Sequence, residues 1–332
     1  MIKHSVAIIG AGIAGLALAR RLSGFAEVTI FEKSRGTGGR MATRRGEHGS
    51  FDHGAQYFTI RDPAFHDALE PMLDNGTVQA WSEPLHRMGA DGQVEKLEDR
   101  SPRFVAVPSM TALAKSWASA LNFQTETQIR KISGEPRRWL VETEDERFGP
   151  FDWVISSAPA PQTAALMPFK EPEQAMLREV RMNGCFTMMI RLPDDVLLPF
   201  NACQVEHDRL SWIGANNSKP ERDAAPCIIV HANNEWAQTH LDSALDQVRE
   251  NMLAALTTIL PNLPLASAMN VALHRWRYAS VEQPLGEAFL LDEDRQLAAC
   301  GDWCMGNRVE AAFISGHRLG DALTSIIKEN AA

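Results

Sequence analysis

The glycine-rich segment VAIIGAGIAGLALARRLSGFAEVTIFE, residues 6–32, limits the possible folds more than any other part of the chain. Residues 6–9 are a short apolar run that predicts a buried strand, residues 14–22 have the apolar spacing of a helix, and residues 28–31 predict a second strand. A strand, a tight glycine turn, a helix and a second strand within about 30 residues make a βαβ unit. Such a unit requires a parallel sheet covered by helices, so the sequence predicts an α/β fold.

The spacing of the glycines in this turn predicts a nucleotide site. Gly10 permits the tight turn, Gly12 lets backbone amides approach a pyrophosphate, and Gly15 lets the helix pack closely on the strand. The phosphates would then lie at a helix N-terminus, where free N–H groups and the helix dipole favour negative charge. Glu32 follows the second strand and would accept hydrogen bonds from ribose hydroxyls. We therefore expect a Rossmann-like dinucleotide-binding domain.

A second glycine cluster separates FAD from NAD as the expected nucleotide. The segment EKSRGTGGR, residues 32–40, places glycines directly after the ribose carboxylate, which an NAD site does not need and an extended FAD often does. Residues 33–59 read as one long irregular stretch, and a loop of that length is usually functional. Its basic residues could attract an anionic substrate, although ordinary surface charge is the better interpretation for all of them except Arg40.

The end of the chain carries a third segment of the same kind. AACGDWCMGNRVEAAFISG, residues 298–316, contains a Gly-Asp pair, a short spacer and the small residues of a helix start near 309–312. The positive end of that helix would favour negative charge on a neighbouring ring. The nucleotide domain is therefore expected to be discontinuous and built from both ends of the chain.

The three segments, in this order, resemble the FAD signatures of the flavin-containing amine oxidase and phytoene-desaturase superfamily. Within it, DHGAQYFT (52–59) and HRWRYA (274–279) resemble the renalase branch and its bacterial relatives. The resemblance implies that Arg40 lies along the pyrophosphate and that Asp302 bonds a ribityl hydroxyl of FAD. The cofactor-binding residues that it implies are Gly10, Ala11, Gly12, Ile13, Ala14, Gly15, Glu32, Lys33, Gly39, Arg40, Met41, Gln56, Tyr57, Phe58, Ile129, Gly301, Asp302, Val309, Glu310 and Ala311.

The resemblance also implies an activity. Renalases are FAD oxidases of off-pathway isomers of NAD(P)H, the 2- and 6-dihydronicotinamides; the products are NAD(P)⁺ and, from dioxygen, hydrogen peroxide. Since a dihydropyridine is already a strong hydride donor, no catalytic side chain is expected beyond the flavin. The pocket should be aromatic and apolar with a few polar groups. The residues expected to line it are Tyr57, Trp276, Tyr278, Trp303, Thr187, His231 and Asn233.

Two other functions remain open at this stage. A flavin amine oxidase acting on a small amine would need an acidic or aromatic-caged cation site, and the substrate half offers no obvious one. That superfamily also commonly carries a lysine near the flavin, and no lysine occurs between Asn270 and Tyr278. A non-catalytic flavin-binding sensor is the third possibility. No cysteine lies in the context of a covalent flavin link, so non-covalent FAD is expected.

The rest of the chain predicts a second domain with a mainly antiparallel sheet. A helix is expected over residues 63–75, another over 110–121 with Ser109 as its cap, and a long amphipathic helix over 245–259. Strands are expected at 127–133, 138–143, 152–157, 184–191, 203–206, 210–215 and 226–232. The fold class is thus α/β, with a Rossmann-like FAD-binding domain plus an α+β substrate domain. The FAD-binding domain is assigned to residues 1–75, 100–162 and 285–332, and the substrate domain to residues 76–99 and 163–284.

Composition limits the partners. The net charge of −9 argues against binding to nucleic acid or to acidic membranes. Five cysteines without a CxxC pair indicate free thiols in a reducing compartment, and no metal site is expected. The apolar N-terminal run is broken by glycines and does not read as a signal peptide. We expect a cytoplasmic monomer or weak dimer whose partners are a small-molecule dinucleotide and dioxygen.

Overall fold

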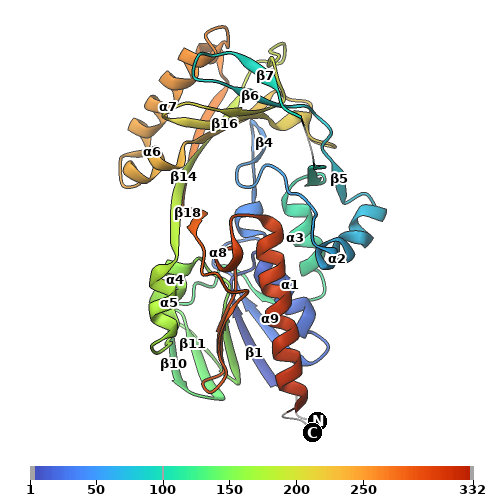
Figure 1. Ribbon diagram of the computed structural model, residues 1–332, viewed down its shortest axis with the longest axis vertical. Helices are drawn as coiled ribbons and strands as arrows, with labels where there is room; N and C mark the ends of the chain where they lie inside the picture. Colours follow the sequence, from blue (N-terminus) through green and yellow to red (C-terminus); the bar gives the residue numbers. More distant parts are fainter. Residues whose placement is uncertain (1–3, 99–100, 330–332) are drawn as a thin grey trace.

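The computed structural model describes residues 4–98 and 101–329, and its lower half in Figure 1 is built on a six-stranded sheet. The strand order is β19-β20-β13-β1-β2-β9, with every neighbouring pair parallel except β19–β20. The strands are β1 (His4–Ile9), β2 (Ala26–Phe31), β9 (Asn122–Gln124), β13 (Trp153–Ser156), β19 (Leu290–Asp292) and β20 (Leu297–Ala299). The predicted α/β class with a Rossmann-like domain is confirmed.

Helices from both ends of the chain cover this sheet. Helix α1 packs along α9, and the two lie side by side in Figure 1. Their contact is close because Gly316 of α9 has no side chain: a Cβ there would strike the carbonyl oxygen of Ala14. Helix α3 packs on α1, and α2 packs on α9. The bounds are α1 (Ile13–Leu22), α2 (Pro63–Asp74), α3 (Thr111–Ala118), α8 (Asp302–Met305) and α9 (Val309–Glu329).

A small three-stranded antiparallel sheet and two short helices flank the six-stranded sheet. The acidic residues 144–146 lead into β12, a strand that the sequence analysis missed. Residues 163–180, expected in the substrate domain, instead share a core cluster with β1 and β13. Met167, Phe169 and Leu177 of that segment are buried. These elements are β10 (Lys131–Glu135), β11 (Arg138–Glu142), β12 (Arg147–Phe151), α4 (Ala160–Leu166) and α5 (Glu173–Glu179).

A seven-stranded sheet forms the upper half in Figure 1. Its order is β18-β14-β17-β16-β15-β6-β7, and its neighbours are antiparallel except for β15 and β6. One face packs on α6 and α7 through an apolar cluster that includes Phe186, Met188 and Val230. The elements are β6 (Leu85–Met88), β7 (Val94–Lys96), β14 (Arg181–Arg191), β15 (Ala202–Val205), β16 (Leu210–Ala215), β17 (Cys227–Ala232), β18 (Asn270–Gln283), α6 (Asn234–Thr239) and α7 (Leu245–Ile259).

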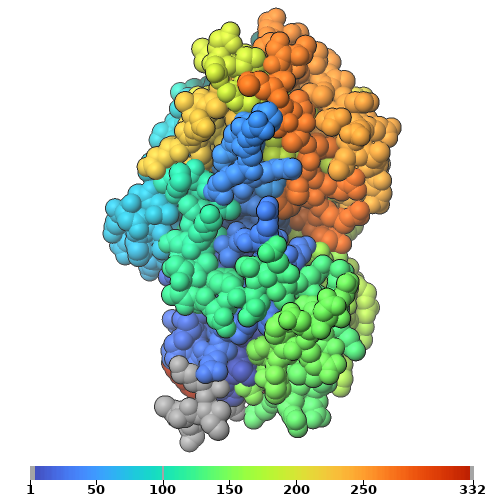
Figure 2. All heavy atoms as spheres, turned by 180° about the vertical axis from the view of Figure 1, so that it is seen from behind, coloured from blue at the N-terminus to red at the C-terminus, as the bar shows by residue number. Residues whose placement is uncertain are grey.

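The stretch 33–59, expected to be irregular, contains a β-hairpin. Its strands are β3 (Thr43–Gly46) and β4 (Gly49–Asp52), and Gly49, the first residue of β4, adopts φ +123° after the turn. Phe51 packs on Met189 and Ile229 of the seven-stranded sheet. In Figure 2 this hairpin, in blue, lies over the upper half of the molecule. The remaining elements are β5 (Val78–Ala80), β8 (Phe104–Ala106), η1 (Gly39–Met41), η2 (Asn216–Ser218) and η3 (Leu265–Ser267).

Ser109 does not cap the helix that follows it. The cap of α3 is Met110, without a side-chain hydrogen bond. The Ser109 hydroxyl lies 3.0 Å from Thr111 Oγ1 and accepts a hydrogen bond from Arg45 at 2.7 Å. The hydroxyl therefore bonds side chains and does not bond the first amides of α3. All five cysteines are buried free thiols. Over the described ranges, no helix is both long and apolar enough to span a membrane.

Candidate cofactor and substrate site

The first glycine turn has the geometry that a pyrophosphate needs. Gly10 adopts φ +107°, and its N–H donates to Phe31 O at 2.9 Å, which locks the turn to the end of β2. A Cβ at Gly15 would strike the Gly10 carbonyl and the Ser157 hydroxyl. Gly12 caps α1 with no side-chain acceptor, and its Cβ direction is open space. The first amides of α1 are therefore left for an external anion, so this turn fits a dinucleotide.

Glu32 is held in place at the end of β2. The residue is 7% exposed; its Oε2 accepts from Ala11 N at 2.8 Å and its Oε1 accepts from Ser34 N at 2.8 Å. Each carboxylate oxygen keeps a further lone pair for a ribose hydroxyl. The side chain of Lys33, next in the chain, is exposed.

The second glycine cluster docks on the first. Gly38 N donates to Ala11 O at 2.9 Å, and Gly38 and Gly39 adopt φ +114° and +52°. Arg40 then forms a two-point ion pair with Asp302, at 2.7 and 2.6 Å, and Nη1 also donates to Ala279 O at 3.2 Å. Three segments far apart in sequence thus meet at the carboxyl end of the parallel strands, where nucleotides bind in open α/β sheets.

Asp302 and Glu310 have protein partners that the sequence did not reveal. Asp302, expected to bond a ribityl hydroxyl, has both carboxylate oxygens on Arg40. Glu310 is 4% exposed, and its Oε1 accepts from the backbone amides of Arg61 and Asp62 at 2.6 and 2.8 Å. Glu310 therefore ties the start of α9 to the start of α2. Among the other expected cofactor residues, Ala11, Ile13, Ala14, Met41, Phe58, Ile129, Gly301 and Ala311 are buried, and Val309 is half-buried.

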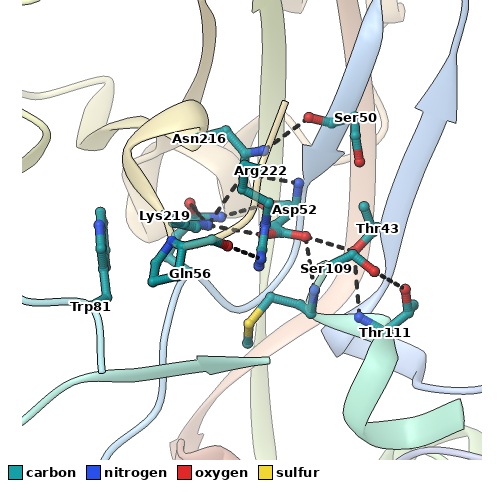
Figure 3. A network of polar contacts seen from close by, with 12 residues as sticks. Thr43, Ser50, Asp52, Gln56, Trp81, Ser109, Thr111, Asn216, Lys219 and Arg222 are labelled. Atoms are coloured by element: carbon teal, nitrogen blue, oxygen red, sulfur yellow. Dashed lines mark hydrogen bonds and ion pairs between the residues drawn. The ribbon is translucent and has the colours of Figure 1, made fainter. Parts of the chain in front are cut away.

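A buried charge cluster is centred on Asp52, in the segment whose Ala55 N–H donates to Arg40 O at 2.9 Å. Asp52 has no exposed surface; its Oδ2 pairs with Arg222 Nη2 at 2.8 Å and with Lys219 Nζ at 3.3 Å. Its Oδ1 accepts from Thr43 Oγ1 at 2.6 Å and Met110 N at 3.1 Å. Figure 3 shows how η2 and the segment after it bring the two cations to this carboxylate.

The pKa values of this cluster follow from burial and charge. Burial alone would raise the pKa of Asp52, but the charges of Lys219 and Arg222, with the Thr43 hydrogen bond, lower it to about 2. Burial lowers the pKa of Lys219 to about 8, against the opposing effect of Asp52. One carboxylate thus faces two cations, so the cluster has an excess of positive charge.

The seven-stranded sheet presents a row of polar side chains toward this cluster. In the strand register, Thr187 lies opposite both His274 and His231, and His231 lies opposite Trp212. Residues directly opposite each other share a face, so these side chains form one row across β18, β14, β17 and β16. The row faces the 52–57 loop, because Gln56 Nε2 lies 3.4 Å from His231 Nε2.

At one end of the row, His53 stacks on Trp276, with ring centroids 5.0 Å apart, and meets the edge of His274 at 4.9 Å. Trp276 Nε1 donates to His53 O at 2.9 Å. Burial, followed by the charges of His274 and Arg44, lowers the pKa of His53 to about 4. Burial also lowers the pKa of His274. Both imidazoles are therefore neutral at neutral pH.

At the other end of the row, Tyr57 lies against Trp212 and Trp81, with ring centroids 5.9 and 6.2 Å apart. The Arg103 guanidinium stands over the rings of Tyr57 and Trp81, at 5.6 and 5.4 Å. The Gln56 amide is fully engaged with protein groups, so a contact between Gln56 and FAD would have to come from its backbone.

The structure gives two of the expected pocket residues other roles. Trp303 has no exposed surface and donates its indole N–H to Ala158 O at 3.0 Å, because it fills the core beneath the six-stranded sheet. Asn233 caps α6, and its amide oxygen accepts from Glu235 N at 2.9 Å. Thr187 is buried on the sheet face, and Tyr278 on β18 is half-buried.

Sequence reasoning missed Lys219, Arg222, His53, Arg103 and Trp212. The segment NNSKPERD, residues 216–223, is so polar that it reads as a surface loop, and nothing in it signals that two of its cations are buried. A neighbouring surface hollow of about 560 Å³, lined by Glu47–Gly49, Arg191, Asp194 and 223–226, contains none of the expected site residues.

Comparison with known proteins agrees with this geometry. Residues 8–74 match the family of NAD(P)-binding Rossmann-like domains. Mouse renalase (Mus musculus) is 23% identical over 309 residues, which cover 85% of this chain and 86% of that protein. The chain is a renalase homologue.

Solved structures share its fold over nearly the whole length. A protein described as a protoporphyrinogen oxidase from Exiguobacterium sp. 255-15 superposes with a TM-score of 0.79 at 12% identity, covering 98% of this chain and 99% of that one. Cyclohexylamine oxidase from Brevibacterium oxydans gives 0.75 at 12% identity, covering 98% and 100%. For this renalase homologue, the relatives and the dinucleotide-binding domain support a flavin-dependent oxidase with FAD as its cofactor.

Proposed function

We propose that this renalase homologue oxidises isomeric dihydronicotinamide dinucleotides, the 2- and 6-dihydro forms of NAD(P), to NAD(P)⁺. Bound FAD would supply the redox chemistry by accepting a hydride from the dihydropyridine and passing the electrons to dioxygen, which yields hydrogen peroxide. The Gly10–Gly15 turn, Glu32 and the Arg40–Asp302 pair are the groups that would hold the FAD.

The excess of positive charge at the Asp52 cluster is the observation that favours a dinucleotide substrate over an amine. Asp52 is already matched by Lys219 and Arg222, so this carboxylate is not available to an ammonium group. A protonated amine would meet net repulsion at short range, whereas the phosphates of a dinucleotide would be attracted.

The side chains on the sheet face are suited to an uncharged ring. His53 and His274 are neutral, and with Trp276 they form an aromatic cluster at the 52–57 loop, in which His53 stacks on Trp276 and His274 is edge-on to both rings. Such a group can stack on a dihydropyridine and exclude water. No proton has to be removed by the protein, which agrees with imidazoles kept neutral by burial.

Anaerobic rapid mixing of the purified FAD-loaded protein tests the proposal through the loss of yellow flavin absorbance. The donors are borohydride-reduced NAD⁺ isomers, ordinary NADH, and a panel of amines that includes cyclohexylamine, with free FAD as the control. Fast bleaching by the isomers alone is the expected result. Bleaching by an amine while the isomers leave the flavin oxidised would assign the protein to amine oxidation instead.

A further inference from the structure

The side-chain amide of Gln56 has one possible orientation. Its Oε1 lies 3.2 Å from Lys219 Nζ, and its Nε2 lies 2.6 Å from Asp52 O and 3.0 Å from Gly54 O. An ammonium can only donate and a carbonyl oxygen can only accept. Rotating the amide by half a turn would oppose donor to donor and acceptor to acceptors, so three partners fix the side chain (Figure 3).

Lys219 is equally fixed. Besides Gln56 Oε1, its three N–H groups reach Asp52 Oδ2 and Asn216 Oδ1, both at 3.3 Å. Its side chain is 1% exposed, so the three protein acceptors replace water. The buried Lys219 ammonium therefore donates to the Gln56 amide oxygen, and the nitrogen of the same amide donates onward.

The next member of this chain of contacts is His231. Gln56 Nε2 is a donor only; besides its two carbonyl acceptors it lies 3.4 Å from His231 Nε2, so one of its two N–H groups is shared between two acceptors. The contact is attractive only if His231 Nε2 is unprotonated and accepts, which leaves the ring proton on Nδ1.

We propose that Gln56 and Lys219 are positioning residues that hold His231 as the neutral tautomer protonated at Nδ1. The groups that face His231 agree with a neutral ring: Lys219 is a cation, and Thr187 and Trp212 beside it are uncharged. Burial, with the charges of Lys219 and His53, lowers the pKa of His231 to about 3.

The consequence for the sheet face is a row of fixed donors. Thr187 Oγ1 and Trp212 Nε1 are buried and have no hydrogen-bond partner among the described residues. His231 lies between them in the register and adds Nδ1–H. Such a row suits an uncharged carbonyl oxygen, such as the carboxamide of a nicotinamide; this second step rests on the proposed function.

NMR of the FAD-loaded protein with ¹⁵N-labelled histidine tests this proposal. Long-range ¹H–¹⁵N couplings show which ring nitrogen of His231 carries the proton. A His231→Gln variant assigns the signals. We expect protonation at Nδ1 in the wild type and its movement to Nε2 in Gln56→Glu, because a carboxylate would accept from that nitrogen. Gln204→Glu adds the same charge at an exposed site on β15 of the same sheet and should change nothing.

Lys219→Met should populate both tautomers, and Lys219→Arg should restore the wild-type spectrum. A wild-type ring protonated at Nε2, or a Gln56→Glu spectrum like that of the wild type, would overturn the proposal even if Lys219→Met fails to fold. NAD⁺ titration tests the second step: its affinity should fall about tenfold in Gln56→Glu, equivalent to about 1.4 kcal/mol. Unchanged affinity would refute the carboxamide contact but not the assignment of the tautomer. Neither measurement depends on which donor reduces the flavin.

Discussion

Arg40 and Asp302 stand 262 positions apart in the chain and form a two-point ion pair, Nη1 to Oδ2 at 2.7 Å and Nη2 to Oδ1 at 2.6 Å. The Asp302 side chain is 7% exposed and that of Arg40 is 30% exposed, so the pair is partly shielded from water. It joins the segment after the second glycine cluster to the segment before α9. The two segments expected to hold the middle of FAD are thus fixed relative to each other by this pair.

Asp302→Asn should therefore weaken FAD binding. The substitution removes a charge-assisted pair worth about 1.5–3 kcal/mol, which corresponds to a loss in affinity of roughly 10- to 150-fold. Flavin fluorescence titration of the apoprotein measures the affinity. Asp242→Asn breaks the exposed Arg277–Asp242 pair and should leave FAD binding unchanged. Equal affinity in the wild type and Asp302→Asn would contradict the assignment.

Glu32→Ala should lower both FAD occupancy and the stability of the apoprotein. The carboxylate accepts from Ala11 N and Ser34 N, so its removal leaves two amides without an acceptor, at a cost of about 1–3 kcal/mol each. The flavin-to-protein absorbance ratio after dialysis and urea unfolding of the apoprotein report the two effects. Glu27→Ala, at an exposed position on the same strand, is the matched control. Full retention of FAD by Glu32→Ala would refute a role for this residue in binding.

Asp52→Asn should destabilise the fold strongly at neutral pH. It leaves Lys219 and Arg222 buried without a counter-ion, and breaking such a cluster costs about 3–5 kcal/mol. Urea unfolding measures the loss, and Asp145→Asn on the exposed 143–146 turn is the control. A loss as small as that of the control would show that the cluster does not stabilise the fold.

The same variant has a predictable pH dependence. The pKa of Asp52 is about 2 in the fold and about 4 in an unfolded chain. The contribution of the Asp52 carboxylate to the free energy of unfolding is therefore complete above pH 4. It is lost as the pH falls toward 2, since the unfolded state then binds the additional proton. The difference in unfolding free energy between the wild type and Asp52→Asn should shrink over that interval. A constant difference would mean that the fold does not lower the pKa of Asp52.

The rate of flavin reduction should show no titration of His53 or His231 near neutral pH. Burial is the main cause that lowers their pKa values, to about 4 and about 3, so both rings stay neutral from about pH 6 upward. Anaerobic reduction followed across pH 6 to 9, at about one-unit steps, checks this. A histidine-like inflection that disappears in His53→Gln would show that the ring is charged when the donor binds.

Trp276→Ala should slow flavin reduction or raise KM while FAD stays bound. It removes the ring that stacks on His53 and the indole N–H that bonds His53 O. Stopped-flow reduction and the flavin-to-protein ratio separate the two effects. Trp236→Ala, on α6 behind the same sheet, serves as the control. Loss of FAD from Trp276→Ala would give this residue a structural role only.

The nucleotide half of the molecule could be predicted well because its rules are local. Glycine spacing and an acidic residue after a strand specify a βαβ turn without reference to the rest of the chain. Two features that the sequence analysis missed elsewhere were also readable locally: Gly46 and Gly49 mark the β3–β4 turn, and Asn233 is a strongly preferred helix cap.

The substrate side could not be predicted to the same depth because its contacts are distant in sequence. Asp52 meets Lys219 and Arg222 across about half of the chain, and only the packed structure shows that all three are buried. Trp303 stands beside the Gly-Asp motif, yet its indole N–H bonds Ala158 O, in the connection between β13 and α4. Burial of aromatic and charged groups is decided by tertiary packing, which a single sequence does not reveal.

The order in which this sheet is assembled has a consequence for biosynthesis. Strand β13 pairs on one side with β1 and on the other with β20, and α9 follows β20. While the chain is still on the ribosome, the glycine turns exist but the edge of β13 is uncovered, and an uncovered edge can pair with other chains. The parallel sheet and the Arg40–Asp302 pair can therefore be completed only after the C-terminal part of the chain has been made.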